Sequence, residues 1–460
     1  MILSGFFHLI IPYFCSNTES FLMNELKWTN WSHSFSSFPK QILSPSTEKE
    51  IIGIVKEAKK TKSKIKIVGS GHSCSQIAET KSGILISLEK YNSILSFNPK
   101  TLTLKVKAGI SLKDICIFLK KNNAALANMG TIDPQSIAGA ISTGTHGTGI
   151  KYGALDQQIT SIELITSNGE LIEVNKTKNE AFFNETILNL GALGIISKVT
   201  IQCVPFYNLE VNAKSISFDE MLHSFQLIQS NDYLRFWWVP HTDKVQLWKA
   251  NKTQKPPTKQ NKISAWIDGT LKGNIIHEIG LWLTSFKPNL IPKLNDFMHY
   301  LLFAKRNYEI GDFHRMFTLD INVKQSVMEY GIPIEKTKNV ISEIRTLISK
   351  ENFKVHMPIE LRFAPKNDAI LSMSYKRDTC YIGIISYKPF GKEIEHDIYF
   401  EKVHQIFKKY DGRPHWAKKH FYKTEELENL YPQWTNFKSH KNQMDPIKMF
   451  ENDFLKTLFN

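Results

Sequence analysis

A short glycine turn that carries a histidine is the feature that most constrains the fold of this chain. Gly69-Ser70-Gly71-His72-Ser73 directly follows residues 64–68, whose composition predicts a β-strand. Glycines at alternate positions allow backbone conformations closed to other residues, so successive N–H groups can converge on an anion such as a pyrophosphate. Cys74 stands where the Rossmann fingerprint has its third glycine, which disfavours a nicotinamide cofactor. Taken alone, the motif would more often be an ordinary turn with a surface histidine.

A second glycine-rich segment, residues 136–149, gives the first one a partner. It contains small residues, hydroxyls and four glycines, without a charged side chain. Such a run lets backbone approach a ligand closely, while Ser and Thr oxygens meet the polar groups of that ligand. The segment is too apolar for a flexible linker because it includes Ile137, Ala138, Ala140 and Ile141. We therefore expect two segments that face one phosphate-bearing ligand.

With these two segments, the chain resembles the vanillyl-alcohol oxidase type of FAD enzyme. Within that superfamily it is most similar to the sugar-lactone and sugar-alcohol oxidases, which include gulonolactone, arabinonolactone and alditol oxidases. Three further motifs carry the resemblance: Glu360-Leu361-Arg362, Pro414-His415-Trp416-Ala417-Lys418 and the path Asn128-Met129-Gly130-Thr131. The resemblance covers about residues 35–440, and the linked set is specific although each motif alone is not.

The resemblance implies an α+β fold, with a two-subdomain FAD-binding domain and an α+β substrate (cap) domain that contains a large antiparallel sheet. We expect four parts: an N-terminal extension over 1–34, the FAD-binding domain over 35–208, the cap domain over 209–405, and a C-terminal segment over 406–460 that returns to the flavin site.

Local patterns in the first half agree with a domain of strands and helices. Residues 102–107 alternate as a half-buried strand should, and Ser111 opens a helix through Leu119 with a capping box. Ser167-Asn168-Gly169-Glu170 lies between apolar alternations and predicts a hairpin with a type I′ turn.

The resemblance implies FAD as the cofactor. In the related enzymes the histidine of the glycine turn is bonded covalently to the flavin, which implies an 8α-histidyl link through His72. Lys418 matches a lysine that reaches the flavin N1 and C2 region, where a cation stabilises the reduced, anionic flavin. The resemblance extends the cofactor-binding set to Ile67, Val68, Gly69, Ser70, Gly71, Ser73, Gly130, Thr131, Ser136, Gly139, Ala140, Ser142, Thr143, His146, Gly147 and Ile195.

Glu360 and Arg362 are the candidates for substrate chemistry. Two apart on an expected strand, they point to the same face, where a guanidinium can stabilise a developing alkoxide and a carboxylate can accept a hydroxyl proton. By themselves the residues would more often form a cross-sheet ion pair, and the resemblance reverses that ranking because the family uses this Glu-x-Arg pair. Thr131 and Ser386 are expected to contact the substrate as well. Ile384 departs from a histidine that alditol oxidases carry nearby, which favours a lactone.

Gly130 bears on the electron acceptor. Plant galactonolactone dehydrogenases carry at the matching position an alanine that blocks oxygen near the flavin, so a glycine predicts access for O2; an ordinary turn glycine is the alternative. We therefore expect an FAD-dependent oxidase of a sugar-derived 1,4-lactone, of the gulono-, galactono- or arabinono-lactone type, that produces hydrogen peroxide. The alternatives are an alditol oxidase, a flavin reductase that uses a pyridine nucleotide, and a non-catalytic sugar-binding flavoprotein.

Composition agrees with an enzyme of at least two cores and disfavours other classes. The chain has 460 residues, of which 42% are hydrophobic. Its five cysteines are odd in number, widely spaced and without a C-x-x-C pair, so we expect no disulfide framework and no metal site. The net charge is +14, but the basic residues are scattered, so we expect no nucleic-acid partner.

Two apolar segments bear on whether the protein is exported and whether it contacts a membrane or another protein chain. Residues 1–15 lack a clean cleavage site, and Met23 is an alternative start, so the sequence predicts a cytoplasmic protein without a convincing signal peptide. Residues 280–303 are strongly apolar, but too polar on average to span a bilayer. They predict a helix pair in the core or at an interface, with a peripheral membrane contact as the alternative. The oligomeric state stays open.

Overall fold

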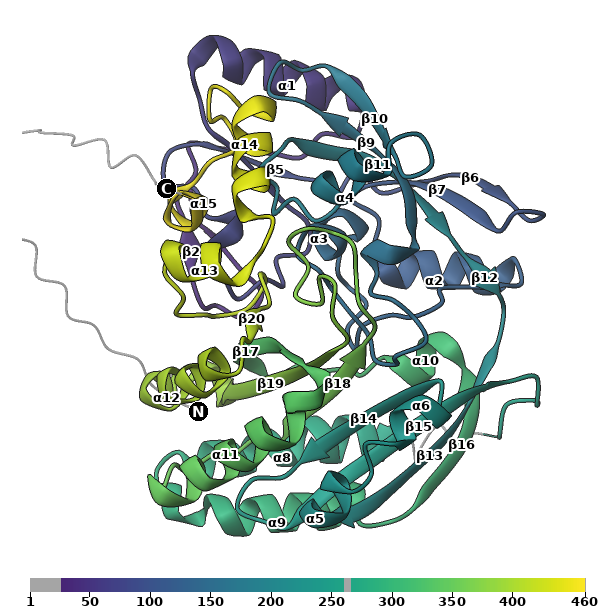
Figure 1. Ribbon diagram of the computed structural model, residues 1–460, viewed down its shortest axis with the longest axis vertical. Coiled ribbons are helices and arrows are strands. Elements are labelled where there is room, and N and C mark those ends of the chain that lie inside the picture. The colour runs from purple at the N-terminus through teal and green to yellow at the C-terminus, as the bar shows by residue number, and fades with distance from the viewer. Residues whose placement is uncertain (1–25, 260–265, 460) are drawn as a thin grey trace, which may run out of the picture.

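The computed structural model describes residues 26–259 and 266–459, which form two lobes, each built around β-sheet (Figure 1). What we expect of residues 1–25 lies outside the described residues.

Two sheets form the first lobe, which is the upper one in Figure 1. A parallel sheet has the strand order β3-β5-β4, and an antiparallel sheet has the order β10-β9-β11-β7-β6. The strands are β3 (Gln41–Leu43), β4 (Ile65–Val68), β5 (Ile84–Ser87), β6 (Ile94–Asn98), β7 (Thr103–Lys107), β9 (Ile159–Ile165), β10 (Leu171–Asn175) and β11 (Ile195–Gln202). The helices are α1 (Glu48–Thr61), α2 (Leu112–Lys121), α3 (Ile137–Ser142) and α4 (Glu180–Thr186). Four short strands form two separate antiparallel pairs, β1 (Trp28–Thr29) with β2 (Ser36–Ser37) and β8 (Ala124–Ala125) with β12 (Val204–Pro205).

Helix α1 connects two parallel strands, and its sequence explains where it starts and which side it buries. The Thr47 side chain accepts a hydrogen bond from the Glu50 backbone N–H and so caps the first turn. Ile51, Val55 and Ala58 recur at helical spacing and are buried against the sheet. The strand over 102–107 and the helix opened by Ser111 are also confirmed, as β7 and α2.

The β9–β10 hairpin is confirmed, but the predicted type I′ turn is wrong. The Gly169 N–H donates to the Thr166 carbonyl, so the central residues of the turn are Ser167 and Asn168. Type I′ requires positive φ at both central residues. Within the turn, all of which is described, Gly169 alone has a positive φ, of 75°. The loop is therefore closed by a left-handed glycine after the central pair, a common form of longer hairpin connection.

An antiparallel sheet of eight strands forms the second lobe, as expected for the large sheet of an α+β fold. Its order is β16-β13-β15-β14-β18-β19-β17-β20, with β13 (Asn208–Ser217), β14 (Tyr233–Trp238), β15 (Lys244–Thr253), β16 (Asn307–Asp312), β17 (Lys324–Pro333), β18 (Ile359–Ala364), β19 (Thr379–Lys388) and β20 (Arg413–Pro414). The helices are α5 (Phe218–Leu222), α6 (Leu227–Ser230), α8 (His277–Thr284), α9 (Ile291–Phe303), α10 (Phe313–Phe317), α11 (Thr337–Lys350) and α12 (Asp397–Lys409).

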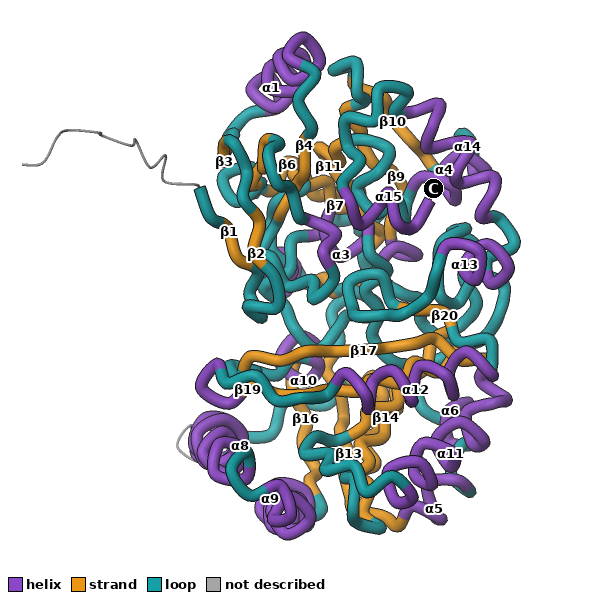
Figure 2. The backbone as a smooth tube through the Cα atoms, turned by 90° about the vertical axis from the view of Figure 1, so that its left-hand side faces the viewer, coloured by secondary structure: helices purple, strands orange, loops and turns teal. Residues whose placement is uncertain are grey.

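The register of this sheet decides which side chains share a face. Leu361 and Phe363 alternate with Glu360 and Arg362 on β18, and both apolar side chains are fully buried in the main core. The opposite face therefore carries the two charged side chains. Figure 2 shows α8 and α9 at one side of the second lobe and α11 and α12 at the other.

The chain returns to the first lobe at its C-terminal end through α13 (Thr424–Leu430), α14 (Trp434–Met444) and α15 (Asp453–Phe459). The Met449 carbonyl accepts from the Ile65 N–H, and the buried Lys66 side chain donates to the Phe450 carbonyl. The boundary that we expected between 405 and 406 falls inside α12, because the chain enters the sheet once more as β20 before it returns.

Among the described residues, no helix combines the length and the apolar character that a membrane crossing needs. The helix pair predicted over 280–303 is present as the end of α8 and the whole of α9.

Candidate active site

A cavity opens in the first lobe where β4 ends and α3 begins. Most of the predicted cofactor-binding residues line it, namely Ile67, Val68, Gly69, Ser70, Gly71, His72, Ser73, Ser136, Gly139, Ala140, Ser142, Thr143 and Ile195. The two glycine-rich segments, far apart in the sequence, therefore face the same space. Sequence reasoning missed Trp28, Phe35 and the loop from Asn189 to Gly191, which also line the cavity.

The glycines of the turn keep the two segments close together. A Cβ on Gly69 would lie 2.0 Å from the Ser136 Oγ, and Gly71 has a φ of 69°. A larger residue at position 69 would push the segments apart, and one at 71 would be strained. Backbone thus stays accessible at this cavity wall, as the binding of a phosphate-bearing cofactor such as FAD requires.

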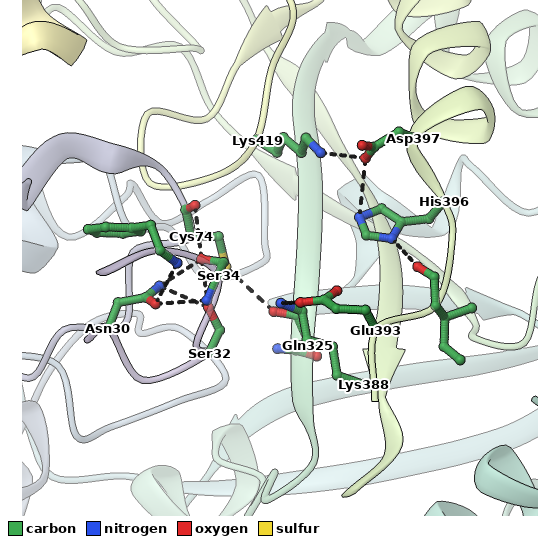
Figure 3. A network of polar contacts seen from close by, with 12 residues as sticks. Asn30, Ser32, Ser34, Cys74, Gln325, Lys388, Glu393, His396, Asp397 and Lys419 are labelled. Carbon is green, nitrogen blue, oxygen red and sulfur yellow. Dashed lines mark hydrogen bonds and ion pairs between the residues drawn. The ribbon is translucent and has the colours of Figure 1, made fainter. Parts of the chain in front are cut away.

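Asn30 and Trp31, which lie inside the expected N-terminal extension, hold the turn in place. The Trp31 N–H donates to the Gly71 carbonyl at 2.8 Å, and the Asn30 amide donates to the Ser73 carbonyl at 2.9 Å. Figure 3 shows Asn30 in a polar network that reaches Cys74, whose Sγ lies 3.9 Å from the Gln325 carbonyl oxygen of the second lobe. The expected division at 34/35 therefore separates Asn30 and Trp31 from the turn that they support.

His72 is kept neutral by its surroundings. Its ring stacks on Trp31 with 5.0 Å between ring centres. Burial and, to a smaller extent, the positive charges of Lys418 and Lys324 together lower the pKa of His72 to about 4. At neutral pH this imidazole therefore has an unprotonated nitrogen, which is the form that can bond to carbon.

The C-terminal segment brings Lys418 to this turn. The Cys74 N–H donates to the Ala417 carbonyl at 2.7 Å, and the Ser75 hydroxyl donates to the Trp416 carbonyl at 2.6 Å. The buried Trp416 fixes the segment from the other side by donating to the Leu371 carbonyl. Lys418 and His72 come from opposite ends of the chain, and the fold makes them neighbours.

A second group of charged residues lies on the large sheet. The Arg362 Nε is 3.3 Å from a Glu360 carboxylate oxygen, which confirms that both side chains share a face. The other end of the guanidinium donates to Glu329 at 2.7 Å. The Trp237 indole N–H donates to Glu360 at 2.8 Å. Glu360 and Arg362 are each only 13% exposed, so these contacts are shielded from solvent.

Glu329 is the main site residue that sequence reasoning missed. It lies 3.4 Å from His146 Nε2, and its side chain is 3% exposed. Burial alone would raise the pKa of Glu329, but Arg362 and then His146 hold that pKa well below its usual range. One signal was available, because Glu329 is the only acidic residue between Ser326 and Pro333, in a run that is otherwise apolar or uncharged. An isolated charge in a buried strand indicates a specific partner.

His146 and His415 complete this cluster. The His146 ring stacks on Tyr381 at 3.5 Å between ring centres, and burial lowers the pKa of both histidines. Together with Glu329, the two histidines bring potential metal-ligating atoms within 4.8 Å of one another. The Glu329 carboxylate is already paired with the fixed positive charge of Arg362, which opposes a second cation at the same place.

Several predicted residues lie between the two groups. His146 and Gly147 are not among the residues that line the cofactor cavity. His146 contacts Glu329 and Tyr381 of the large sheet, and Thr148 bonds to Phe363 and Leu234. A Cβ on Gly147 would lie 2.0 Å from the Asn128 side-chain oxygen, so the path 128–131 packs directly on the glycine-rich segment. The Thr131 carbonyl accepts from the Leu319 N–H, which joins Gly130 and Thr131 to the second lobe.

Ser386 is not brought to this site. It pairs with Ser326, whereas Glu360 pairs with Gly383, three positions away from Ser386 on β19. Successive side chains on a strand alternate between faces, so Ser386 points to the opposite side of the sheet and is buried there. The substrate contact expected for Ser386 is therefore wrong. A residue one position away from the correct one on a strand points to the other face of the sheet.

Comparisons with known proteins agree with this arrangement. Residues 39–175 match a family described as FAD binding domain, and residues 199–458 match the D-arabinono-1,4-lactone oxidase family. The L-gulonolactone oxidase of Scyliorhinus torazame is 35% identical over 94% of this chain and 98% of its own length. The L-gulono-1,4-lactone dehydrogenase of Mycobacterium tuberculosis is 30% identical over 93% of this chain and 98% of its own length. The D-arabinono-1,4-lactone oxidase of Candida albicans is 28% identical over 87% of this chain and 85% of its own length.

The comparison with solved structures supports the fold and does not address the function. The cholesterol oxidase of B. sterolicum superposes with a TM-score of 0.73 at 17% identity, and the match covers 98% of this chain and 100% of that one. The match to the lactone oxidase family covers more than half of the sequence, and the similarity to gulonolactone oxidases extends over nearly all of it. The chain therefore belongs to the D-arabinono-1,4-lactone oxidase family of flavoenzymes, together with the L-gulonolactone oxidases and dehydrogenases.

Proposed function

We propose that this protein oxidises a sugar-derived 1,4-lactone with FAD and passes the electrons to O2, producing hydrogen peroxide. The observation that carries the proposal is the shielded Glu360–Arg362 pair, on a sheet face joined to the glycine-rich segment of the cofactor cavity. A carboxylate and a guanidinium side by side can bind one hydroxyl group. The carboxylate can accept its proton, and the guanidinium can stabilise the negative charge left on its oxygen.

The proposed roles of these residues follow from their chemistry. Glu360 accepts the proton of the reacting hydroxyl, and the Trp237 N–H keeps the carboxylate oriented toward that proton. Arg362 stabilises negative charge on the same oxygen, and Glu329 holds the guanidinium in position. Bound FAD supplies the acceptor for the hydride that leaves the neighbouring carbon.

Two further residues act on the cofactor in this proposal. His72 would hold the flavin covalently through an imidazole nitrogen, and the neutral state of this imidazole supports that role. Lys418 supplies a positive charge next to the His72 turn, where the cofactor gains negative charge during reduction. Gly130 keeps the approach of O2 open because it has no Cβ.

Acid precipitation and a peroxide assay test the proposal. We expect yellow flavin to stay with the acid-precipitated protein and to be lost from a His72→Ala variant. We also expect peroxide with D-arabinono-1,4-lactone or L-gulono-1,4-lactone, and less with xylitol. Absence of peroxide with every lactone would refute the oxidase, and bleaching of the flavin by NADPH would favour the reductase alternative. Flavin released on precipitation would refute only the covalent bond.

A peripheral contact with a membrane is a second proposal, supported by the surface of α8 and α9. Leu283, Phe286 and Phe297 are 56%, 60% and 51% exposed, although they are large and apolar. Lys392 lies 3.7 Å from the Phe286 ring centre, so positive charge borders the apolar patch. In a flotation assay, we expect the protein to rise with vesicles that contain phosphatidylserine. A smaller fraction of a Phe286→Glu variant should rise with them. Dimerisation that the same substitution abolishes, without any vesicle binding, would refute the membrane contact.

A further inference from the structure

Arg235 is a buried guanidinium without a hydrogen-bond acceptor. It lies in β14 and is 7% exposed. Among the described residues, no carboxylate or carbonyl oxygen accepts from its guanidinium, and its Nε is enclosed without a partner. Arginine has five N–H donors, and a buried donor left unpaired costs free energy. Arg413, the other buried arginine among the described residues, donates to the Leu430 and Tyr375 carbonyls.

Two tryptophans hold Arg235 in place. The centre of its guanidinium lies 4.5 Å from the Trp237 ring centre and 4.7 Å from that of Trp248. Rings attract the face of a guanidinium and leave the N–H groups at its edge available. Burial lowers the pKa of Arg235 to about 10, so the group is still a cation at neutral pH. The arrangement fixes the plane of a donor whose acceptor must come from elsewhere.

The register aims Arg235 at the candidate active site. Arg235 pairs directly with Arg362 across β14 and β18, and Trp237 pairs with Glu360. Paired residues of antiparallel strands point to the same face, one strand spacing of about 4.8 Å apart. Trp237 connects the groups, because its ring contacts Arg235 and its N–H donates to Glu360. The unpaired donor is therefore adjacent to the groups that hold the reacting hydroxyl in the proposed function.

The charges of the site indicate which ligand Arg235 takes. Glu329 and Glu360 balance Arg362 and Arg235, so these four neighbouring side chains sum to no net charge. A neutral ligand rich in acceptor oxygens preserves that balance, whereas a carboxylate would upset it. In a lactone with a hydroxyl on C2, the carbonyl oxygen on C1 is the acceptor next to the reacting group.

We propose that Arg235 is a substrate-binding residue that donates hydrogen bonds to the carbonyl oxygen of the lactone, one strand away from the Glu360–Arg362 pair that holds the reacting hydroxyl. This inference rests on the proposed lactone oxidation and adds a specificity determinant to it. The site then recognises two neighbouring oxygens of the substrate with two different guanidinium groups, which distinguishes a lactone from a polyol.

Steady-state kinetics of an Arg235→Met variant test the assignment, with D-arabinono-1,4-lactone as substrate. We expect KM to rise about 10- to 100-fold, as for loss of a hydrogen bond to a charged group, and kcat to change less. The inhibition constant of 1,4-anhydro-D-arabinitol, which is the same ring without the carbonyl oxygen, should stay unchanged. An Arg235→Lys variant keeps a cation and should recover part of the affinity for the lactone.

Arg345→Met is the matched control. Arg345 also lies over an aromatic ring, 4.3 Å from the Phe218 ring centre, but it is on α11 and paired with the exposed Asp243. Its replacement should leave both constants unchanged. Equal weakening of the lactone and the anhydro sugar in Arg235→Met would overturn the proposal, since it indicates a structural role, and so would an unchanged KM.

The two proposals fail in different ways. If the wild-type holoenzyme produces no peroxide from lactones, the proposed function fails, while lactone binding is still measurable from the change in flavin absorbance. If wild-type protein oxidises the lactone and Arg235→Met does so with the same KM, the function stands and the role of Arg235 is refuted.

Discussion

At the scale of single residues, the site depends on buried charges that have specific partners. Glu329 is the clearest case, because its carboxylate contacts Arg362 and His146 in a place that water does not reach. Removing one partner of such a group leaves an uncompensated charge, which costs far more than losing an exposed ion pair.

A Glu329→Gln variant should therefore lose both stability and activity. We expect the free energy of unfolding to fall by about 3 kcal/mol, measured in denaturant, since Arg362 loses its buried counter-charge. Asp368→Asn is the control, because Asp368 pairs with Lys376 at the surface, where both side chains are more than half exposed. The Asp368→Asn substitution should lower the free energy of unfolding by less than about 1 kcal/mol. Equal effects of the two substitutions would contradict a structural role for the buried pair.

Gly130 gives a second prediction at this scale. A Cβ there would lie 3.3 Å from the Thr145 methyl carbon and 3.4 Å from the His146 carbonyl oxygen, so alanine fits with small shifts. We expect Gly130→Ala to slow reoxidation of the reduced enzyme by O2, while reduction by the lactone stays close to the wild-type rate. Stopped-flow absorbance of the flavin separates the two steps. Unchanged reoxidation would show that oxygen takes another route.

At the scale of elements, close contact between β4 and α3 shapes the cofactor cavity. Gly69 ends the strand region and Ser136 caps the helix, and the space between them leaves no room for a methyl group.

A Gly69→Ala variant should bind little FAD. The new Cβ would lie 2.0 Å from the Ser136 Oγ, so the two segments must separate. Gly53→Ala is the same substitution in the exposed part of α1, where no atom lies within 4 Å of the added Cβ. We expect it to keep full FAD content and to stabilise the helix by about 0.5–1 kcal/mol. The measurement is flavin absorbance per protein chain, and full FAD content in Gly69→Ala would refute the steric argument.

At the scale of the whole molecule, burial of histidines makes the fold sensitive to acid. Burial lowers the pKa of His277, His404 and His420 to about 4 and that of His356 to about 3. The unfolded chain takes up these protons near pH 6.5, whereas the folded chain does not. Stability contributed by the neutral histidines is therefore complete above pH 6.5 and is lost as the pH falls from 6.5 toward 4.

Thermal unfolding between pH 7 and 4.5 tests this. The melting temperature should fall over that window, and each histidine contributes at most about 1.4 kcal/mol per pH unit to the free energy of unfolding. His420 has no hydrogen-bond partner on either ring nitrogen among the described residues, so His420→Phe should reduce the pH dependence. The exposed His223 provides the control, and His223→Gln should leave the pH dependence of the melting temperature unchanged. A His420→Phe variant as acid-sensitive as the wild-type protein would contradict the argument.

Local sequence patterns predicted much of the fold and part of the site. The glycine turn after β4 and the glycine-rich segment over α3 were recognisable because close backbone approach requires small residues. The shared face of Glu360 and Arg362 was predictable because residues two apart on a strand point the same way, whereas their place in the active site came from the family resemblance. The turn type at Gly169 was not predictable from the sequence, since both hairpin forms use the same residue types.

The sequence by itself determined which segments carry the chemistry, because glycine spacing and strand alternation are local properties of the chain. Only the tertiary structure decided which side chains meet. Strand register turned Ser386 away and set Glu329 and Arg235 beside Arg362, and the return of the C-terminal segment brought Lys418 to His72. Those contacts join residues distant in sequence, and they depend on how sheets pair and lobes pack rather than on any local pattern.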